Sequence, residues 1–467
     1  MGIMKRLMAS LLAVTMVAGF ALSVSAADVK FSGSYYVLGA TANDWGLNKE
    51  DRTTASLYAQ RLRVGTDFKV AEGLTLTTQF DALEGRWGQF GRYQNEEMSR
   101  GTAGGWNGAD GTNDSKNISF DRAYVTFAVP YGSFRVGRGS AGNWGTKFAN
   151  QDGDSDQIAY TGNLGNWTLG WKIEKGYESV ADGVNWNTNH SQADGDTDKY
   201  EISGIYKFKG GSAGLKIAYN RDARKTYNGA GPDTGYKKEY VAFQPYVQAT
   251  LGPVFLEAEL NYNTGQANDY EDNNVIGHDD RNLRGMSAYL HGKVNMGPAY
   301  FGALYAYVSG QDPKSKTVNS GGDGGRAWDQ NNLILWGYYA NKWAGMLGGG
   351  NGALYGQTGY DYIAMTNAHE LKAYAGFNPT PKWNIQGSVA YAVADKTAPT
   401  NGINQADYVD HKYGTEVDLT ASYKIFDNLT YTVGFGYLWA GDYFKGTNKN
   451  ANVDDTYLLL NKLDLTF

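Results

Sequence analysis

The chain contains no cysteine, and this absence limits what it can be. Without thiols, no disulfide framework can stabilise an exported domain, and no thiolate metal site can form. A cysteine-linked lipid anchor behind an export signal is excluded for the same reason. The fold must therefore be stabilised by hydrogen bonding and packing alone.

Patterns typical of enzymes and of nucleic-acid-binding proteins are also missing. The five histidines show no metal-ligand spacing, and neither HExxH, GxSxG nor a phosphate-binding glycine loop occurs. The 42 Lys and Arg against 48 Asp and Glu give a net charge of −6, whereas a phosphate backbone is bound by clustered positive charge. We therefore expect no enzyme, no resident cofactor and no nucleic-acid partner.

The N-terminus has the pattern of an export signal. Lys5 and Arg6 precede an apolar stretch, residues 7–20, which is followed by the small-residue run SVSAAD. Cleavage after Ala26, or one residue later, fits a secretory signal peptide, with an uncleaved anchor as the alternative. Its removal changes the charge balance to 40 minus 48, or −8. No later apolar run approaches about 18 residues, so no membrane-spanning helix is expected.

What the chain has in excess is glycine and tyrosine, with 62 and 35 residues. This excess suits a β-rich chain, and residues 61–82 show the pattern of its strands: apolar and polar side chains alternate on both sides of the turn AEG. Such alternation predicts two antiparallel strands joined in a hairpin. The apolar face of the first strand carries Leu62, Val64, Thr66, Phe68 and Val70.

This hairpin unit repeats along the chain. Eight hairpins, a first strand beginning at Asp28 and a last strand ending at Phe467 predict 18 strands, with 16 or 20 as alternatives. The segment 309–367 fits either a further hairpin or a loop that folds inward. Pro245 lies mid-strand and predicts either a bulge or a misplaced boundary. Long connections rich in Gly, Asn and Asp alternate with the short turns, at residues 86–116, 176–198, 264–282 and 310–366.

We predict an all-β fold: a transmembrane antiparallel up-and-down β-barrel of about 18 strands, with short periplasmic turns and long extracellular loops. Soluble sandwich domains seldom exceed about 250 residues, yet residues 27–467 repeat one motif without a composition break. We therefore expect residues 1–26 to be a cleaved signal peptide and residues 27–467 to form a single barrel domain. Lipid would cover the apolar face, including Leu463, Leu465 and Phe467, and the last strand would close on the first.

The signal, the hairpins and the C-terminal Phe467 resemble the Gram-negative outer-membrane porins, of the trimeric general-diffusion type, over the whole mature chain. Asn461 departs from the pattern, because it interrupts the apolar face of the last strand. The resemblance implies an outer-membrane location, a homotrimer, contact with lipid and lipopolysaccharide, and recognition of Phe467 by the barrel assembly machinery. It also implies a water-filled channel for ions and small hydrophilic solutes.

A basic wall is expected inside the barrel. Rings of charge and whatever narrows the bore set the selectivity of such a pore. Inward positions of the early strands carry Arg61, Arg63, Arg122 and Arg135.

An acidic loop is expected to face this wall. The stretch GSAGNWGTKFANQDGDSDQ is the third long loop by hairpin count, and it carries Asp152, Asp154 and Asp156 at alternate positions. In the porins that the chain resembles, the third loop folds into the bore and places acids opposite arginines. We therefore expect a constriction here. The alternative is a solvated loop tip, with the arginines merely keeping the lumen wet.

Three weaker patterns leave alternatives open. DGDSD at 152 and DGDTD at 194 match only the first half of a calcium loop, since Asn163 or Ile205 would stand where the bidentate Glu is required. Surface calcium is therefore a weak expectation. Eight of the twelve tryptophans lie outside the predicted strands, which fits an interfacial girdle better than an aromatic slide for sugars. The alternatives to a general porin are a channel selective for a sugar or organic acid, or a structural or adhesion barrel.

Overall fold

The computed structural model describes residues 28–44, 46–50, 54–87, 118–146, 148, 153–178, 196–223, 236–270, 279–322, 324–325, 332–337, 364–397 and 407–467. The predicted signal peptide, Asp152 and the first two residues of the second acidic repeat (194–198) lie outside these residues. No helix within the described ranges is long and apolar enough to span a membrane.

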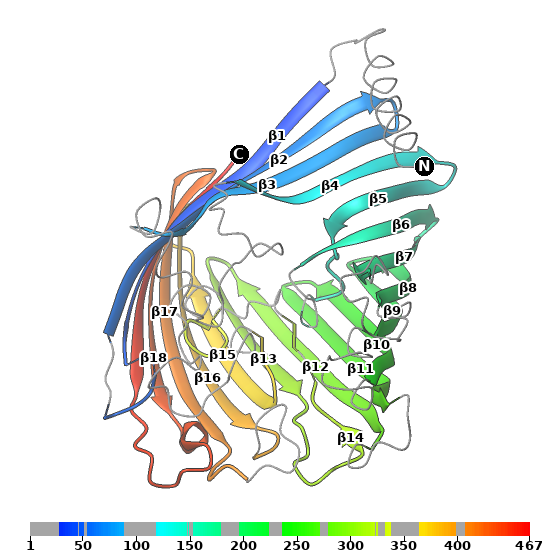
Figure 1. Ribbon diagram of the computed structural model, residues 1–467. Helices are drawn as coiled ribbons and strands as arrows, with labels where there is room; N and C mark the ends of the chain where they lie inside the picture. Colours follow the sequence, from blue (N-terminus) through cyan, green and yellow to red (C-terminus); the bar gives the residue numbers. More distant parts are fainter. Residues whose placement is uncertain are drawn as a thin grey trace, which may run out of the picture.

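Antiparallel strands curve round into a closed wall (Figure 1). Eighteen of the nineteen strands form it, and β14 (Val318–Asn319) is a two-residue pairing beside β12. The prediction of an 18-stranded barrel is confirmed. The wall strands are β1 (Asp28–Asn43), β2 (Thr54–Ala71), β3 (Leu74–Arg86), β4 (Ile118–Val129), β5 (Gly132–Ser140), β6 (Asp154–Leu164), β7 (Trp167–Tyr177), β8 (Thr197–Phe208), β9 (Gly211–Asp222), β10 (Tyr236–Leu251), β11 (Val254–Tyr270), β12 (Arg281–Met296), β13 (Ala299–Val308), β15 (Ala368–Phe377), β16 (Trp383–Ala394), β17 (Lys412–Phe426), β18 (Leu429–Ala440) and β19 (Thr456–Thr466).

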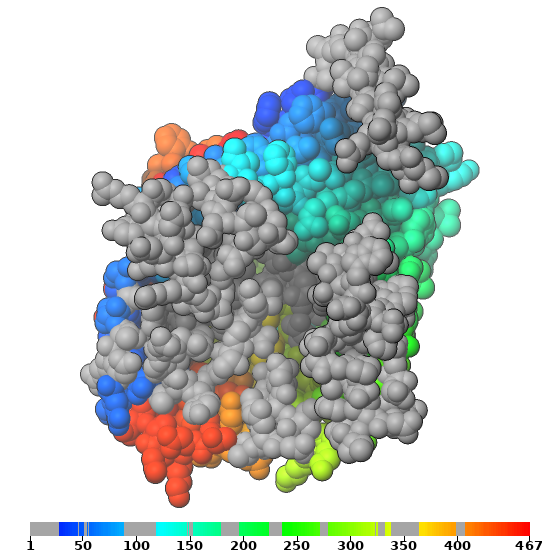
Figure 2. Space-filling view, in the orientation of Figure 1, coloured from blue at the N-terminus to red at the C-terminus, as the bar shows by residue number. Residues whose placement is uncertain are grey.

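The barrel closes where β19 pairs with β1, as the sequence predicts. In Figure 2 the red and orange C-terminal residues lie beside the blue N-terminal ones. Phe467 exchanges two backbone hydrogen bonds with Gly33, of 2.8 and 3.0 Å. The Phe467 ring lies over Gly33, where a Cβ would stand 2.6 Å from the ring. A side chain at position 33 would therefore disturb the seam.

Alternation decides which side chains face outward. On β18, the large apolar residues Tyr431, Val433 and Phe435 are 40 to 43% exposed, whereas Leu438 on the other face is fully buried. Because neighbouring strands pair directly opposite, outward residues lie beside outward residues all round the wall. The predicted outward face of the last strand is observed, with Leu459 half exposed and Leu458 buried.

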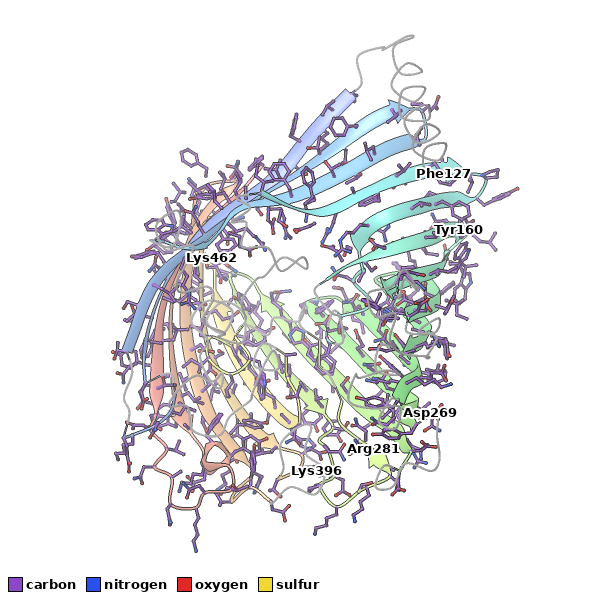
Figure 3. The ribbon with its side chains drawn as sticks, viewed as in Figure 1. Phe127, Tyr160, Asp269, Arg281, Lys396 and Lys462 are labelled. Atoms are coloured by element: carbon purple, nitrogen blue, oxygen red, sulfur yellow. The ribbon has the colours of Figure 1, made fainter. Side chains whose placement is uncertain are left out.

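The wall is not uniform in length. β2 has 18 residues and β10 to β12 have 16 or 17, whereas β5 has nine and β6 and β7 have eleven. In Figure 3, Asp269 and Arg281 lie at the loop ends of β11 and β12, and Lys396 lies just after β16, in the lower part of the view. Short strands also occur elsewhere in the wall, since β13 and β15 have ten residues each.

Pro245 lies within β10, so the predicted strand boundary stands. The pairing with β9 runs through Pro245 opposite Leu215, and no register shift occurs there. Towards β11, the pairing omits Gln244 and Pro245 and then resumes in the same register. The backbone carbonyl of Gln244 accepts a hydrogen bond from a loop instead, as described below.

Candidate functional site

The predicted basic wall is present on β2 and is matched by acids. Arg63 makes a bidentate pair with Asp81, with two bonds of 2.6 Å, and a further bond of 2.9 Å to Asp121. Arg61 lies 3.8 Å from both Asp81 and Glu84. Asp81 and Glu84 come from β3, which pairs with β2, and Asp121 comes from β4, the next strand along the wall. The two arginines are therefore compensated within the wall and not by a distant loop.

The other two predicted arginines differ from each other. Arg122 on β4 donates from Nε to Asp154 at 2.6 Å. Arg135 on β5 donates to the amide oxygen of Gln157 at 3.2 Å and lies over the Tyr124 ring. In the described part of the chain, no ion pair joins Arg135 to a carboxylate. Its positive charge is thus the least compensated of the four.

The structure places the acids of the third loop differently from the expectation. Asp154 and Asp156 lie in β6 rather than in a loop, because residues 154–162 pair in register with β5 and residues 156–164 with β7. Asp154 meets Arg122 inside the wall. Asp156 lies on the outward face, where its side chain is 63% exposed and 3.4 Å from Arg138. Asp152 lies outside the described residues.

A lattice of charges that the sequence reasoning missed follows on β7, β8 and β9. Lys172 lies 2.5 Å from Glu174 and 2.8 Å from Glu201. Lys199 lies 3.1 Å and 2.5 Å from the same two glutamates, and Lys216 lies 3.9 Å from Glu201. All occupy inward positions, so their alternate spacing along three adjacent strands was the available sequence pattern. Together they extend the inner charged surface from β2 to β9.

The third loop does fold into the barrel, through its described residues 144–146 and 148. The indole of Trp144 donates to the Gln244 carbonyl at 2.7 Å and packs edge-on against Tyr246. Lys216 lies 5.6 Å from the centre of the Trp144 ring. Trp144 is 7% exposed, so it acts as an anchor on β10.

A buried carboxylate holds the next turn of this loop. Thr146 donates from both its backbone N–H and its hydroxyl to Glu259 Oε2, each at 2.7 Å. Gly145 has φ +54°, and a Cβ there would stand 2.5 Å from the same oxygen. Phe148 then stacks on Tyr289 of β12 at 5.2 Å. The loop that leaves β5 is thus fixed to β10, β11 and β12.

A second segment, residues 332–337, is fixed inside the barrel from the long connection after β13. Within the described part of that connection, β14 is too short to be the hairpin that the sequence left open, and the inward alternative is observed. The backbone N–H groups of Leu333, Ile334 and Leu335 all donate to the carboxylate of Glu416, at 2.9, 2.8 and 2.7 Å. Glu416 is fully buried beneath them.

Two side-chain contacts support this segment. Asn332 donates to Glu370 at 2.8 Å and accepts from the ammonium of Lys372 at 2.7 Å. Trp336 packs edge-on against Tyr413 at 5.4 Å. Ile334 and Leu335 are at most 1% exposed, and Leu333 lies over Gly434 and Gly436 of β18, where there are no side chains to displace it.

The arrangement therefore joins two features of a selective bore. Charged side chains line the inner surface of β2 to β9, and two segments are fixed against the inner surfaces of β10 to β12 and of β15 to β18. In each of these two regions a buried acid binds backbone N–H groups of the inward segment: Glu259 on β11 and Glu416 on β17. The sequence gives no direct sign of this, because each is a single inward acid in an ordinary strand.

The tryptophans contribute to both inward segments. Trp144 and Trp336 are buried anchors, whereas Trp87 is half exposed and stacks on the outward Tyr58. Loop packing therefore accounts for two of the three and an outward aromatic pair for the third. Within the described ranges, no group of three His, Cys, Asp or Glu residues is placed to hold a metal ion.

Residues 9–326 match a family model described as Gram-negative porin. No curated protein matches the chain. Solved structures with a similar course include an anion-selective porin from Comamonas acidovorans, at 13% identity and TM-score 0.44, with 94% of this chain and 100% of that chain covered. Another is OpdK of Pseudomonas aeruginosa with vanillate, at 10% identity and TM-score 0.48, covering 94% and 99%. A third is OccD3 (OpdP) of the same species, at 11% identity and TM-score 0.49, covering 95% and 93%.

Proposed function

Because the chain belongs to the Gram-negative porin family and forms an outer-membrane channel for passive diffusion, we propose that its inner charges and its two inward segments filter solutes by charge and size. The observation that supports this most directly is the fixing of residues 144–148 and 332–337 to the inner wall by Glu259 and Glu416. Segments held by buried carboxylates keep one geometry, and a fixed geometry is what discriminates between solutes.

Arg135 is the inner charge we propose to favour anions most strongly. Arg61, Arg63 and Arg122 each face carboxylates at 3.8 Å or less, whereas the described partner of Arg135 is the neutral Gln157. A paired charge has a weak field at a distance, and an unpaired one retains it. The Arg135→Gln channel should therefore become less permeable to anions.

The chain supplies a matched control for this test. Arg138 lies three residues further along β5 but faces outward, with its side chain 51% exposed. Reversal potentials in a planar bilayer under a KCl gradient should shift towards cation preference for Arg135→Gln and stay unchanged for Arg138→Gln. Equal reversal potentials for Arg135→Gln and the wild type would refute the role of Arg135.

The acids give a second matched pair. Asp154→Asn removes the partner of Arg122 inside the wall and should shift the preference towards anions. Asp156→Asn changes an outward residue and should leave the reversal potential as it is. If Asp156→Asn shifts it as much as Asp154→Asn does, the assignment of Asp154 to Arg122 and of Asp156 to Arg138 as separate pairs fails.

The same recordings decide the wider function. Large and nearly ohmic steps are expected for general diffusion, steps blocked by one sugar or organic acid for a selective channel, and little current for a structural barrel. We also propose that residues 1–26 are removed on export, that Phe467 is read by the barrel assembly machinery, that the surface contacts lipopolysaccharide, and that three copies assemble.

A further inference from the structure

The outward face of the barrel carries a row of charges of alternating sign at the loop ends of six successive strands. Each member is the register partner of the next, through β5, β6, β7, β8, β9 and β10. Three are cations and three are anions. The row consists of Arg138, Asp156, Lys175, Asp198, Arg221 and Glu239.

The row does not keep a constant distance from the periplasmic turns. Arg138 is six residues from the first residue of β5, whereas Glu239 is twelve residues from the last residue of β10. A strand tilted by about 40° climbs about 2.5 Å along the barrel axis for each residue. Arg138 thus lies about 15 Å above its turn and Glu239 about 30 Å above its own.

The hydrocarbon layer is compatible with the height of Glu239, at one end of this row, and not with the height of Arg138, at the other. The apolar band of an outer-membrane barrel is about 25 Å tall. On β4, uncharged outward residues continue from Val129 to Ile118, which is about 28 Å by the same rise. On β5, beside it, Arg138 breaks the apolar face at about half that height. A charge at this depth in hydrocarbon is costly, and the cost falls towards the interfaces.

The exposed fractions show that the chain itself does not cover this end in the described residues. The side chains of Arg138 and Asp156 are 51 and 63% exposed, whereas those of Arg221 and Glu239 are 16 and 28% exposed. Arg138 and Asp156 stand side by side on paired strands and 3.4 Å apart. Below them, towards the turns, the rings of Phe127, Phe134, Tyr160 and Trp171 form an outward aromatic cluster, whose members Phe127 and Tyr160 lie at the margin of Figure 3.

We propose that the outward face of β5 to β7 is the contact surface for a second copy of this chain. All copies insert in the same direction, so a rotation axis along the membrane normal brings like heights together. Each copy carries a cation and an anion side by side, so Arg138 of one copy can face Asp156 of the next. Head-to-tail contacts of this kind close into a ring. The aromatic cluster supplies the apolar part of the surface, as aromatic residues do in interface centres.

This inference rests on the proposed assembly of three copies and adds where they meet. Because the chain has no cysteine, a single introduced thiol reports one position. Val136→Cys places it on β5 between Arg138 and the aromatic cluster, and Val389→Cys places it on β16, with 39 and 46% exposure of the two native valines. Outer membranes carrying each variant are treated with a short homobifunctional maleimide. We expect cross-linked oligomers from Val136→Cys and not from Val389→Cys.

A charge exchange tests the ion-pair part without thiols. Arg138→Asp and Asp156→Arg should each lower the oligomer fraction measured by light scattering in mild detergent, and the double exchange should restore it. Monomeric wild-type protein would overturn both the assembly and its surface. Oligomers that cross-link through Val389→Cys, or through neither position, would overturn the surface and leave the assembly standing. Oligomers insensitive to both single exchanges would mean that lipid covers Arg138 and Asp156. This outcome would also overturn the proposed contact surface.

Discussion

Removal of the Glu416 carboxylate should release residues 332–337 from the wall. Three backbone N–H groups donate to this one carboxylate within 2.9 Å, and all participants are buried or nearly so. Leaving a buried N–H group without a partner costs about 1 to 3 kcal/mol, and three donors that share one acceptor are not independent. Asn332 and Trp336 keep their own contacts in the variant. We therefore expect Glu416→Ala to lower the free energy of detaching residues 332–337 from the wall by about 3 to 4 kcal/mol.

This magnitude predicts a large kinetic effect. Each 1.4 kcal/mol is a factor of about ten in an equilibrium, so the detached population should rise by about 100 to 1,000-fold. Leu335→Cys, at a site that is 1% exposed, provides a thiol that reacts with a water-soluble maleimide only when the segment leaves the wall. The labelling rate should therefore rise by the same factor in the Glu416→Ala background.

Two further variants make the test specific. Glu416→Gln keeps one acceptor oxygen but turns an amide donor towards one of the N–H groups, so labelling should be intermediate. Glu257→Ala removes another inward acid, one bonded to His291 and Tyr289 on the wall and not to an inward segment, and should leave labelling unchanged. If Leu335→Cys stays protected in the Glu416→Ala background, the three hydrogen bonds do not hold the segment and the reasoning fails.

Glu259→Ala should produce more frequent closures in single-channel recordings than Thr146→Val. The valine variant keeps the backbone hydrogen bond to the carboxylate, whereas the alanine variant loses both the backbone and the hydroxyl bond. Equal closure rates would contradict the anchoring role. Gly33→Val should lower the temperature at which the folded barrel loses its faster mobility in detergent gels, because the new side chain would meet the Phe467 ring at a cost of about 1 to 3 kcal/mol. Gly204→Ala, whose Cβ would have its nearest neighbour at 3.6 Å, is the matched control and should unfold like the wild type.

The sequence predicts the wall well because alternation and turn position fix both face and register. The three-residue turn AEG, centred on Glu72, places Asp81 opposite Arg63, and the structure pairs them so. The acid partner of that arginine could thus have been found by counting from the turn. At Pro245 the expectation of a bulge or a misplaced boundary was wrong, because the strand continues through it on the β9 side without a register shift.

The inward segments could not be predicted in the same way. Glu259 and Glu416 alternate like any other inward residue, and nothing local shows that a loop more than 80 residues away donates to them. The acidic run at 152–156 misled because alternating acids occur both in loop tips and at strand starts. Asp154 and Asp156 belong to β6, where the backbone pairing of Asp156 with both β5 and β7 outweighs the solvation of a loop.

Because acids of the wall already compensate the arginines, charge selectivity need not depend on an acidic loop across the bore. A wall of four unpaired arginines would need an acidic loop across the bore to offset their repulsion, which is the reason for expecting one. In the structure, Asp81, Glu84, Asp121 and Asp154 supply that offset from the wall itself. The third loop is then free to serve as a steric element held by Glu259. Under the proposed function, size selection and charge selection would depend on different residues, so substitutions should alter one without the other.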